Sequence, residues 1–284
     1  MTVTATSINV SKSEWSRVKS VAAPLLLAAA ILVAWEVAVR FLAIPRYVLP
    51  APSEIATKIF TDRKIIFSQL GVTLFEIVSG YLLSCVVGFC LSVLIVYSTA
   101  FRRGVLPLVV ASQTIPVIAI APILVIWFGY NLIPRIIITA LVAFFPLTIS
   151  FVTGLQTIEP AFIDFFRSLK ANEIQIFTKL RFPAALPNIF GGLKVASTLA
   201  VIGATIGEWV GASAGLGYLM AQDTMQLNTT RVFAALFVLG AFGMAFFAAV
   251  GLIERLSMPW VYRRTKRSRP SHAAGSTQRN DERN

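Results

Sequence analysis

Residues 160–187 read PAFIDFFRSLKANEIQIFTKLRFPAALP, and this stretch decides how the rest of the chain is interpreted. Pro160 suits the first position of a helix, because a backbone N–H at that position would have no hydrogen-bond partner within the helix. After it, apolar residues recur at i, i+3, i+4 and i+7, which is the pattern of one helix face. They are Phe162, Phe165, Phe166 and Leu169. The pattern predicts a short amphipathic helix that presents three aromatic rings.

A second short helix is predicted directly after the first. Asn172 followed by Gln175 is a weak variant of the capping box that begins a helix. Its apolar residues share one face: Ile174, Phe177 and Leu180. We expect Pro183 and Pro187 to end it, because proline interrupts helical hydrogen bonding.

The composition of the whole chain is that of an integral membrane protein. Of 284 residues, 56% are hydrophobic and 13% are charged, against roughly 45–50% and about 25% in soluble proteins. The mean hydropathy of +0.76 agrees. A disulfide-stapled secreted domain is excluded because Cys85 and Cys90 are the only cysteines, and we interpret both as packing residues. The single histidine, His272, excludes a His-based zinc site or a Ser-His-Asp triad within one chain.

Six apolar stretches are long enough to cross a bilayer as helices, which needs about 20 residues. We predict an all-α membrane protein whose spans are residues 21–43, 70–97, 105–128, 132–155, 186–210 and 232–256. Residues 1–20 would form a cytoplasmic tail. Residues 257–284 would form a basic tail, which we expect to be disordered.

Most of the 25 Lys and Arg residues fall in segments that face the cytoplasm if both termini are inside. The net charge of +12 therefore needs no nucleic acid to explain it. The cluster from Arg263 to Arg269 either attracts anionic lipid or is a plain topology signal.

Residues 156–185 then form one long cytoplasmic connection. Aromatic rings exposed there must be shielded from water. The protein's own spans, the membrane interface or a groove on a partner could shield them.

Residues 164–183 resemble the EAA loop of permease subunits of type I ATP-binding-cassette importers. That pattern is E-A-A, three residues, G, nine residues and I-x-L-P. Asp164-Phe165-Phe166 stands at the E-A-A place and Lys170 at the glycine place. Leu180, Phe182 and Pro183 stand at the I, L and P places with the nine-residue gap intact. The two phenylalanines are bulkier than alanine, so the helix needs a matching groove.

The resemblance implies that residues 161–181 are a coupling helix that docks into an ATPase subunit. The implied docking residues are Asp164, Phe165, Phe166, Arg167, Ser168, Leu169, Lys170, Ala171 and Pro183. The chain lacks a G-x-x-x-x-G-K-[ST] loop, so ATP and Mg²⁺ would be bound by that ATPase and this chain would hold no cofactor. The implied assembly also has a second permease copy, for which a homodimer is expected, and a soluble extracytoplasmic binding protein. Its place would be the bacterial cytoplasmic (inner) membrane.

The resemblance covers residues 65–256, as one permease domain, and several strings favour one branch of the family. They are residues 112–116 (SQTIP), 121–124 (APIL), 127–129 (WFG), 144–146 (FFP) and 207–211 (GEWVG). Residues 215–218 (GLGY) and 231–236 (RVFAAL) are most similar to permeases for pyrimidine thiamine precursors and riboflavin. A neighbouring group imports aliphatic sulfonates, taurine and nitrate, which is the alternative.

Ionisable residues inside spans are candidate sites because they are costly there. Glu36 and Arg40 are four apart and are expected to pair. Glu76 would lie near the outer end of its span, within reach of water. Glu208 lies in a run of glycines at every fourth position, Gly203 to Gly215. That stripe allows close packing. Either a neighbouring donor satisfies Glu208, or Glu208 borders the path as part of an outer gate with Trp209 beside it.

Ser112, Gln113 and Thr114 form a polar cluster near Pro116 in the third predicted span. They could line the path, or they could satisfy the backbone groups that the proline frees.

Two other classes of function fit the sequence less well. An ion-driven secondary transporter would need carboxylates near mid-bilayer and internal repeats, whereas Glu76 and Glu208 lie near span ends. A membrane-embedded enzyme would need clustered His, Cys or paired Asp, which the sequence lacks.

Overall fold

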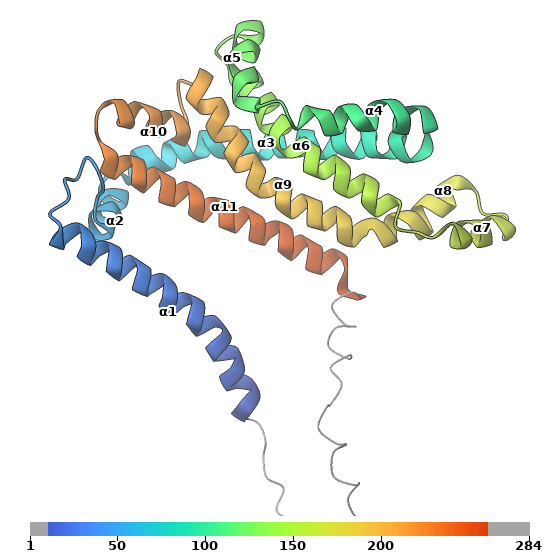
Figure 1. The fold of residues 1–284 in the computed structure, drawn as a ribbon, viewed down its shortest axis with the longest axis horizontal. Helices are drawn as coiled ribbons and strands as arrows, with labels where there is room; N and C mark the ends of the chain where they lie inside the picture. Colours follow the sequence, from blue (N-terminus) through green and yellow to red (C-terminus); the bar gives the residue numbers. More distant parts are fainter. Residues whose placement is uncertain (1–10, 261–284) are drawn as a thin grey trace, which may run out of the picture. The chain divides into compact units, whose positions relative to one another are not determined.

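Helices account for all regular secondary structure in residues 11–260, which are the residues that the computed structural model describes (Figure 1). In chain order they are α1 (Ser11–Phe41), α2 (Pro52–Thr61), α3 (Arg63–Tyr97), α4 (Thr99–Ser112), α5 (Val117–Phe128), α6 (Leu132–Leu155), α7 (Pro160–Ser168), α8 (Glu173–Ile176), the π-helical turn η1 (Phe177–Arg181), α9 (Phe182–Gly211), α10 (Leu216–Met225) and α11 (Thr229–Ser257). The predicted tails, apart from residues 11–20 and 257–260, and the basic cluster lie outside the described residues.

Four helical segments in the described part of the chain are long and apolar enough to cross a membrane. They are Arg63–Tyr97, Leu132–Leu155, Glu173–Gly211 and Thr229–Ser257, and a fifth span results if α4 and α5 count as one. Four of the six predicted spans fall in these helices. The predicted span at residues 21–43 lies within α1, which is not among them, so six spans remain a prediction.

The third predicted span, residues 105–128, is not one continuous helix. α4 and α5 meet at an angle of 99°, with a break at residues 113–116. Pro116 has extended backbone, with φ −66° and ψ 115°, and precedes the first turn of α5. Because proline also disfavours helical backbone in the residue before it, the break falls at Ile115 and Pro116.

The expectation that Pro183 and Pro187 end a helix was wrong. The helix continues from Glu173 through η1 and α9 to Gly211. Pro183 lies in the first turn of α9, directly after the π-helical turn η1. Pro187 lies inside α9, as transmembrane helices tolerate when neighbouring groups satisfy the backbone. The predicted connection, residues 156–185, is therefore helical from Glu173 onward and continuous with α9.

The chain forms two compact units, which are described separately: residues 1–73 with 213–240, and residues 74–212 with 241–284. In the second unit α6 and α9 run antiparallel side by side, with α5 at one end and α7 and α8 at the other (Figure 1). Buried Ala121, Leu124 and Ile138 join α5 to α6. Ile206 and Val210 of α9 pack against them.

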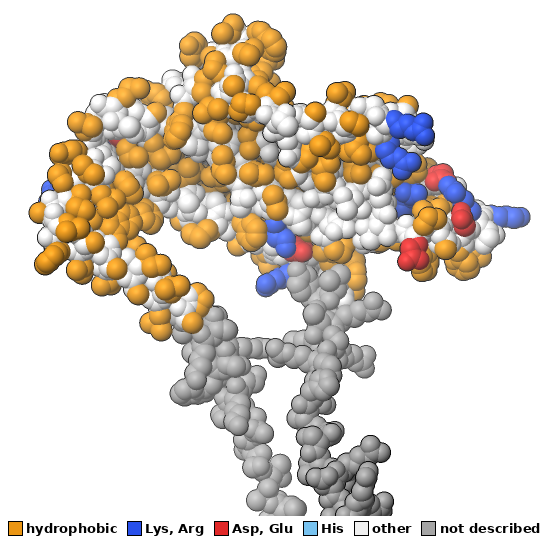
Figure 2. Space-filling view, viewed as in Figure 1, with side chains coloured by type: hydrophobic (Ala, Val, Ile, Leu, Met, Phe, Trp, Pro, Cys, Tyr) orange, Lys and Arg blue, Asp and Glu red, His pale blue; other side chains and the backbone are white. Residues whose placement is uncertain are grey.

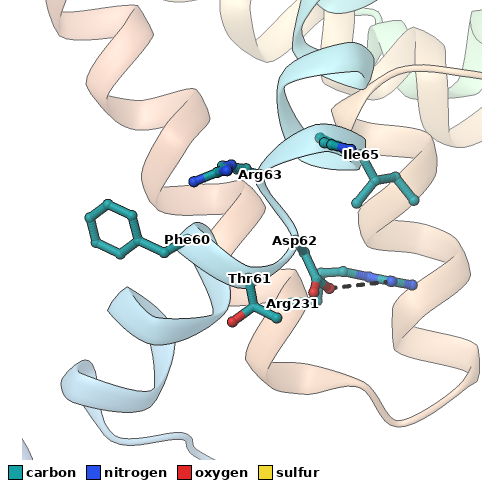
Figure 3. A pocket seen from close by; sticks show the side chains of 7 residues that line it. Phe60, Thr61, Asp62, Arg63, Ile65 and Arg231 are labelled. Carbon is teal, nitrogen blue, oxygen red and sulfur yellow. Dashed lines mark ion pairs between the residues drawn. The ribbon is translucent and has the colours of Figure 1, made fainter.

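Polar contacts hold the first unit together. The predicted pair Glu36–Arg40 is confirmed, with Arg40 Nε 2.6 Å from Glu36 Oε1. The hydroxyl of Ser53, on α2, donates to the same carboxylate at 2.7 Å. Asp62 Oδ2 forms an ion pair with Nη1 of Arg231, from α11, at 3.5 Å (Figure 3). A hollow of about 510 Å³ is lined by both residues. These contacts join α1 to α2, and the α2–α3 turn to α11.

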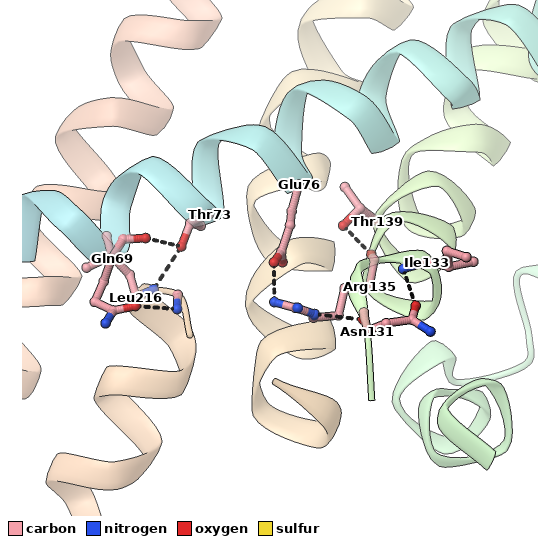
Figure 4. A network of polar contacts seen from close by, with 9 residues as sticks. Gln69, Thr73, Glu76, Asn131, Ile133, Arg135, Thr139 and Leu216 are labelled. Carbon is pink, nitrogen blue, oxygen red and sulfur yellow. Dashed lines mark hydrogen bonds and ion pairs between the residues drawn. The ribbon is translucent and has the colours of Figure 1, made fainter. Parts of the chain in front are cut away.

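The start of α10 is capped by side chains of α3. Gln69 accepts the N–H of Gly215 at 2.7 Å, and Thr73 accepts that of Leu216 at 2.8 Å (Figure 4). Gly215 has φ +122°, which favours glycine. Two backbone donors that would otherwise be unsatisfied are paired in this way.

Candidate functional site

The first candidate surface is the apolar side of α7 and α8. Its members are large exposed hydrophobic residues, and we call them the docking face: Phe162, Phe165, Leu169 and Ile174. Phe165 is 58% exposed and Ile174 is 74% exposed. Ile163 and Ile176, on the same two helices, are buried. Phe166 is half-buried and meets Phe165 edge to face, with ring centroids 6.4 Å apart.

A tight turn after α7 fixes the angle between the two helices. Lys170 has φ +59°, in the left-handed region. The N–H of Ala171 donates to the Phe166 carbonyl at 3.1 Å, which is the long bond of a Schellman motif. Lys170 stands where the EAA pattern has glycine, and the backbone here has the conformation that glycine adopts without strain.

Replacing Lys170 with glycine is therefore expected to stabilise the protein by about 1 kcal/mol, because the left-handed strain of a side chain is removed. An apparent unfolding temperature roughly 2–4 °C higher in detergent would record it. Lys179→Gly is the matched control, because Lys179 is exposed but lies in η1 without positive φ, and it should lower that temperature. A fall for Lys170→Gly equal to that of the control would contradict the assignment.

The predicted capping box at α8 is confirmed. Asn172 Oδ1 accepts the N–H of Gln175 at 2.8 Å, and Gln175 Oε1 accepts the N–H of Asn172 at 3.0 Å. Arg167 Nη2 lies 2.9 Å from Glu173 and so joins α7 to α8. The same hydrogen bond raises the pKa of Arg167, which keeps it charged. The Arg167–Glu173 ion pair is thus a side-chain contact between α7 and α8.

Charged side chains gather around this end of the second unit. Figure 2 shows Lys and Arg near the start of α4 and over α7 and α8, while apolar side chains cover most of the visible face. Arg102 and Arg103 of α4 are both exposed. Such a basic end is typical of the cytoplasmic side of a membrane protein.

The second candidate site is a set of ionisable side chains in the second unit, which we call the buried charge cluster: Glu76, Arg135 and Glu208. They are 0%, 5% and 1% exposed and come from α3, α6 and α9. Arg135 Nη1 forms an ion pair with Glu76 Oε1 (Figure 4). Glu208 is the other charged neighbour of Glu76. Burying three such groups is costly unless they compensate one another.

The start of α6 positions Arg135. Asn131 caps the helix by accepting the N–H of Ile133 at 2.8 Å, and its carbonyl accepts Arg135 Nε at 3.1 Å (Figure 4). On the facing helix, a Cβ added at Gly207 would lie 3.2 Å from Arg135 Cα. The absence of a side chain at Gly207 therefore lets α9 approach α6 beside Arg135, and Glu208 follows in the next position.

Where a glycine of α9 contacts the backbone of α6, we expect that no larger residue is tolerated. A Cβ at Gly203 would lie 2.8 Å from Thr139 Cα, so Gly203→Ala must push α6 away and should cost about 1–3 kcal/mol. Gly191→Ala on the same helix meets nothing within 4 Å and should gain up to about 1 kcal/mol of helix propensity. Unfolding temperatures of the two variants test this, and an equal response would show that the stripe is not a packing contact.

The residues that the sequence predicted for the path and its gate lie in different parts of the structure. Glu208 is buried, whereas Trp209 is exposed on another side of α9. Ser112, Gln113 and Thr114 are exposed at the α4–α5 break. The hydroxyls of Ser112 and Thr114 donate to the carbonyls of Val109 and Ala111 at 2.7 and 2.8 Å, which is local satisfaction of the break.

Sequence reasoning missed Arg135. This arginine was not among the candidate site residues. A signal was available, since two carboxylates predicted inside spans, Glu76 and Glu208, need a cation. Arg135 also lies four residues after Asn131, within the first turn of α6.

These features define a multi-pass helical membrane protein with an exposed apolar surface on α7 and α8. The chain belongs to the family of binding-protein-dependent transport system inner membrane components, whose model matches residues 80–259. It is therefore the membrane component of an ABC transporter and not a catalytic subunit.

Several relatives match over most of the chain. The formylaminopyrimidine transport permease ThiX of Halalkalibacterium halodurans is 40% identical, over 84% of this chain and 95% of its own. The riboflavin permease RibX of Chloroflexus aurantiacus is 28% identical, over 81% and 87%. The putative aliphatic sulfonates permease SsuC of Bacillus subtilis is 29% identical, over 83% and 86%.

The fold is that of a solved transporter. A chain from an inward facing structure of the MetNI methionine ABC transporter matches with a TM-score of 0.61 and 21% identity. The match covers 69% of this chain and 97% of the other.

Proposed function

We propose that this chain forms the translocation pathway of an ATP-driven importer for a small organic nutrient, with a pyrimidine precursor of thiamine as the favoured substrate. The observation that carries this is the 40% identity to ThiX over nearly the whole of both chains. Riboflavin, aliphatic sulfonate, taurine and nitrate are the alternatives, because the permeases named for them match at 28%, 29%, 26% and 27% identity.

The proposed assembly holds two ATPase subunits, a second permease copy and an extracytoplasmic binding protein. The docking face would enter a groove on the ATPase, because exposed aromatic and aliphatic side chains on a rigid helix pair suit such a groove. We place α7 and α8 in the cytoplasm and both termini with them, in the cytoplasmic membrane. The basic residues around α4, α7 and α8 support this orientation.

Coupling would use the continuity of the chain after the docking face. α7 and α8 are joined by the Arg167–Glu173 ion pair, and α8 continues through η1 into α9. A displacement of the docking face by the ATPases would therefore move α9 as a rigid element. The other end of α9 carries Glu208, so a movement at one membrane surface would reach the buried charge cluster near the other.

The path itself would be lined by residues of the broken α4–α5 pair and of α9. Ser112, Gln113, Thr114 and Pro116 are candidates because irregular backbone at membrane depth occurs where it lines a cavity or is buried in protein. Glu208 and Trp209 are candidates for the outer gate.

The substrate is tested by a thermal-shift screen of the extracytoplasmic binding protein of the proposed assembly, using formylaminopyrimidine, riboflavin, taurine, an aliphatic sulfonate and nitrate. We expect formylaminopyrimidine to raise its unfolding temperature most. ATP-dependent uptake of the same compound into proteoliposomes should then require the ATPase. A response to nitrate or taurine alone would overturn the substrate, and uptake that survives ATP depletion but not an uncoupler would overturn the class.

A further inference from the structure

Arg181, the last residue of the π-helical turn η1, is half-buried and has no carboxylate partner among the described residues. Its Nη1 donates to the carbonyl of Leu155 at 3.4 Å, which is a long hydrogen bond, and its Cζ lies 5.4 Å from the ring centroid of Tyr97. Its Nε is buried and has no hydrogen-bond acceptor within residues 11–260. Because arginine stays charged in proteins, a cation held in this way is poorly compensated.

The acids nearby are already paired with another arginine. On the same helical segment, Glu173 lies 2.9 Å from Arg167 Nη2. On α7, Asp164 lies 3.6 Å from Arg167 Nη1. The protein's own carboxylates at this end of the second unit therefore do not neutralise Arg181.

Two further unpaired arginines lie at the start of α4. Arg102 and Arg103 are exposed, and neither forms an ion pair in the part of the chain that the structure describes. The N–H of Arg102 donates to the carbonyl of Ser98 at 3.0 Å, and Ser98 directly follows Tyr97. The arginines of α4 are therefore close to the ring that Arg181 contacts, and Figure 2 shows basic side chains gathered near the start of α4.

The contacts of Arg181 place it where membrane spans end. Leu155 is the last residue of α6, and Tyr97 is the last residue of α3. α6 has 24 residues, which is close to the length that a bilayer requires, so its last residue lies near the level of the lipid headgroups. A cation at this level can meet a phosphate of the membrane itself.

Large apolar side chains are exposed beside the unpaired arginines. Leu94 of α3 is 46% exposed, and Phe101 and Leu108 of α4 are 38% and 69% exposed. Leu94 and Phe101 lie within four residues of Tyr97 on either side of it. Unpaired cations next to exposed apolar surface match the two parts of a phospholipid, whose phosphate is an anion and whose acyl chains are apolar. A soluble anion would leave the apolar side chains uncovered.

We propose that Arg181, Arg102 and Arg103 bind the phosphate of an anionic phospholipid at the turn between α3 and α4. Arginine donors and phosphate oxygens form charge-assisted hydrogen bonds, and the acyl chains cover Leu94 and Phe101. An anionic lipid is favoured over a zwitterionic one, because it carries no ammonium group that the arginines would repel. The proposal requires only that the chain lies in a membrane, so it does not depend on the importer function proposed above.

Lipid titration of the purified full-length chain tests the site. The chain is stripped of lipid in detergent and titrated with phosphatidylglycerol or phosphatidylcholine, and bound lipids are counted by native mass spectrometry. We expect phosphatidylglycerol to bind at least about tenfold more tightly than phosphatidylcholine. Each arginine replaced by glutamine should weaken phosphatidylglycerol binding roughly fivefold. The variants are Arg181→Gln and the double variant Arg102→Gln/Arg103→Gln, whose two exposed side chains can change without disturbing the interior.

Lys179→Gln is the matched control. Lys179 is exposed in the same helical turn as Arg181, but residues two apart lie on different sides of a helix. The control removes the same charge and should change phosphatidylglycerol binding less than twofold.

Three results would overturn the proposal. Equal weakening by Lys179→Gln and by the arginine variants would show a general attraction to a basic surface rather than a site. Equal affinity for the two lipids would exclude a preference for an anionic headgroup. A rise in unfolding temperature with inorganic phosphate as large as that with phosphatidylglycerol would show a soluble-anion site. The assay contains neither an ATPase nor a binding protein, so a failed uptake experiment leaves its outcome unaffected.

Discussion

Phe165→Asp is expected to abolish co-purification of the ATPase subunit while the permease still inserts into the membrane. Phe165 is the most central aromatic residue of the docking face along α7, and it is well exposed in the isolated chain. Replacing an aromatic anchor in an interface costs about 2–4 kcal/mol, or roughly 30-fold or more in affinity. A buried carboxylate without a partner adds to that cost. Nucleotide-driven uptake should be lost with the complex.

The control is Phe165→Leu, which keeps an apolar side chain on the same face. It should retain most of the bound ATPase and a measurable rate of uptake. Both variants are compared at equal amounts of permease in the membrane fraction. A folding defect would lower the amount of inserted permease together with the amount of bound ATPase. Normal ATPase recovery with Phe165→Asp would show that the docking face is covered by something else.

Arg135→Met should have the largest effect on stability of any single substitution in the second unit. It leaves Glu76 buried without its counter-ion, and breaking a buried ion pair from one side costs about 3–5 kcal/mol. The unfolding temperature in detergent should fall by roughly 10 °C or more. Arg135→Lys keeps the charge but loses the bond from Nε to the Asn131 carbonyl, so its fall should be smaller.

A double variant checks that the loss comes from charge rather than from packing. Arg135→Met combined with Glu76→Gln removes both charges and should be more stable than Arg135→Met alone. The coupling between residues in direct contact is expected to be at least about 1 kcal/mol. Strict additivity of the two effects would contradict the ion pair as the cause.

The fold was predictable from sequence where local patterns decide it. The spacing of Phe162, Phe165 and Leu169 placed α7 and its exposed face, and Asn172 with Gln175 gave the cap of α8. The left-handed turn at Lys170 follows from the position that the EAA pattern gives to glycine. These features depend on residues within one or two helical turns of each other, so sequence spacing is sufficient.

Proline was harder to interpret, because its effect depends on what surrounds it. Pro116 breaks a predicted span, whereas Pro183 and Pro187 do not end one. Pro183 falls in the first turn of α9, directly after the π-helical turn, and that boundary was not visible in the sequence. Hydropathy along the sequence carries no information about either outcome.

The buried charge cluster was only half predictable. Glu208 and its glycine stripe were found from sequence, but Glu76 was expected near water and is fully buried. Arg135 was not among the predicted site residues. A charge at the start of α6 can be buried or can lie at the membrane surface. The outcome depends on how closely α9 packs on α6 at Gly207. That is a contact between residues more than 70 positions apart.

The central claim is that α7 and α8 are the surface held by an ATP-hydrolysing partner. It is tested most directly by a photo-crosslinking amino acid at position 165 in cells that also produce the ATPase subunit of the proposed assembly. We predict one major crosslinked product, which contains the permease and the ATPase. Crosslinking only to lipid, or to a protein outside the cytoplasm, would contradict the account.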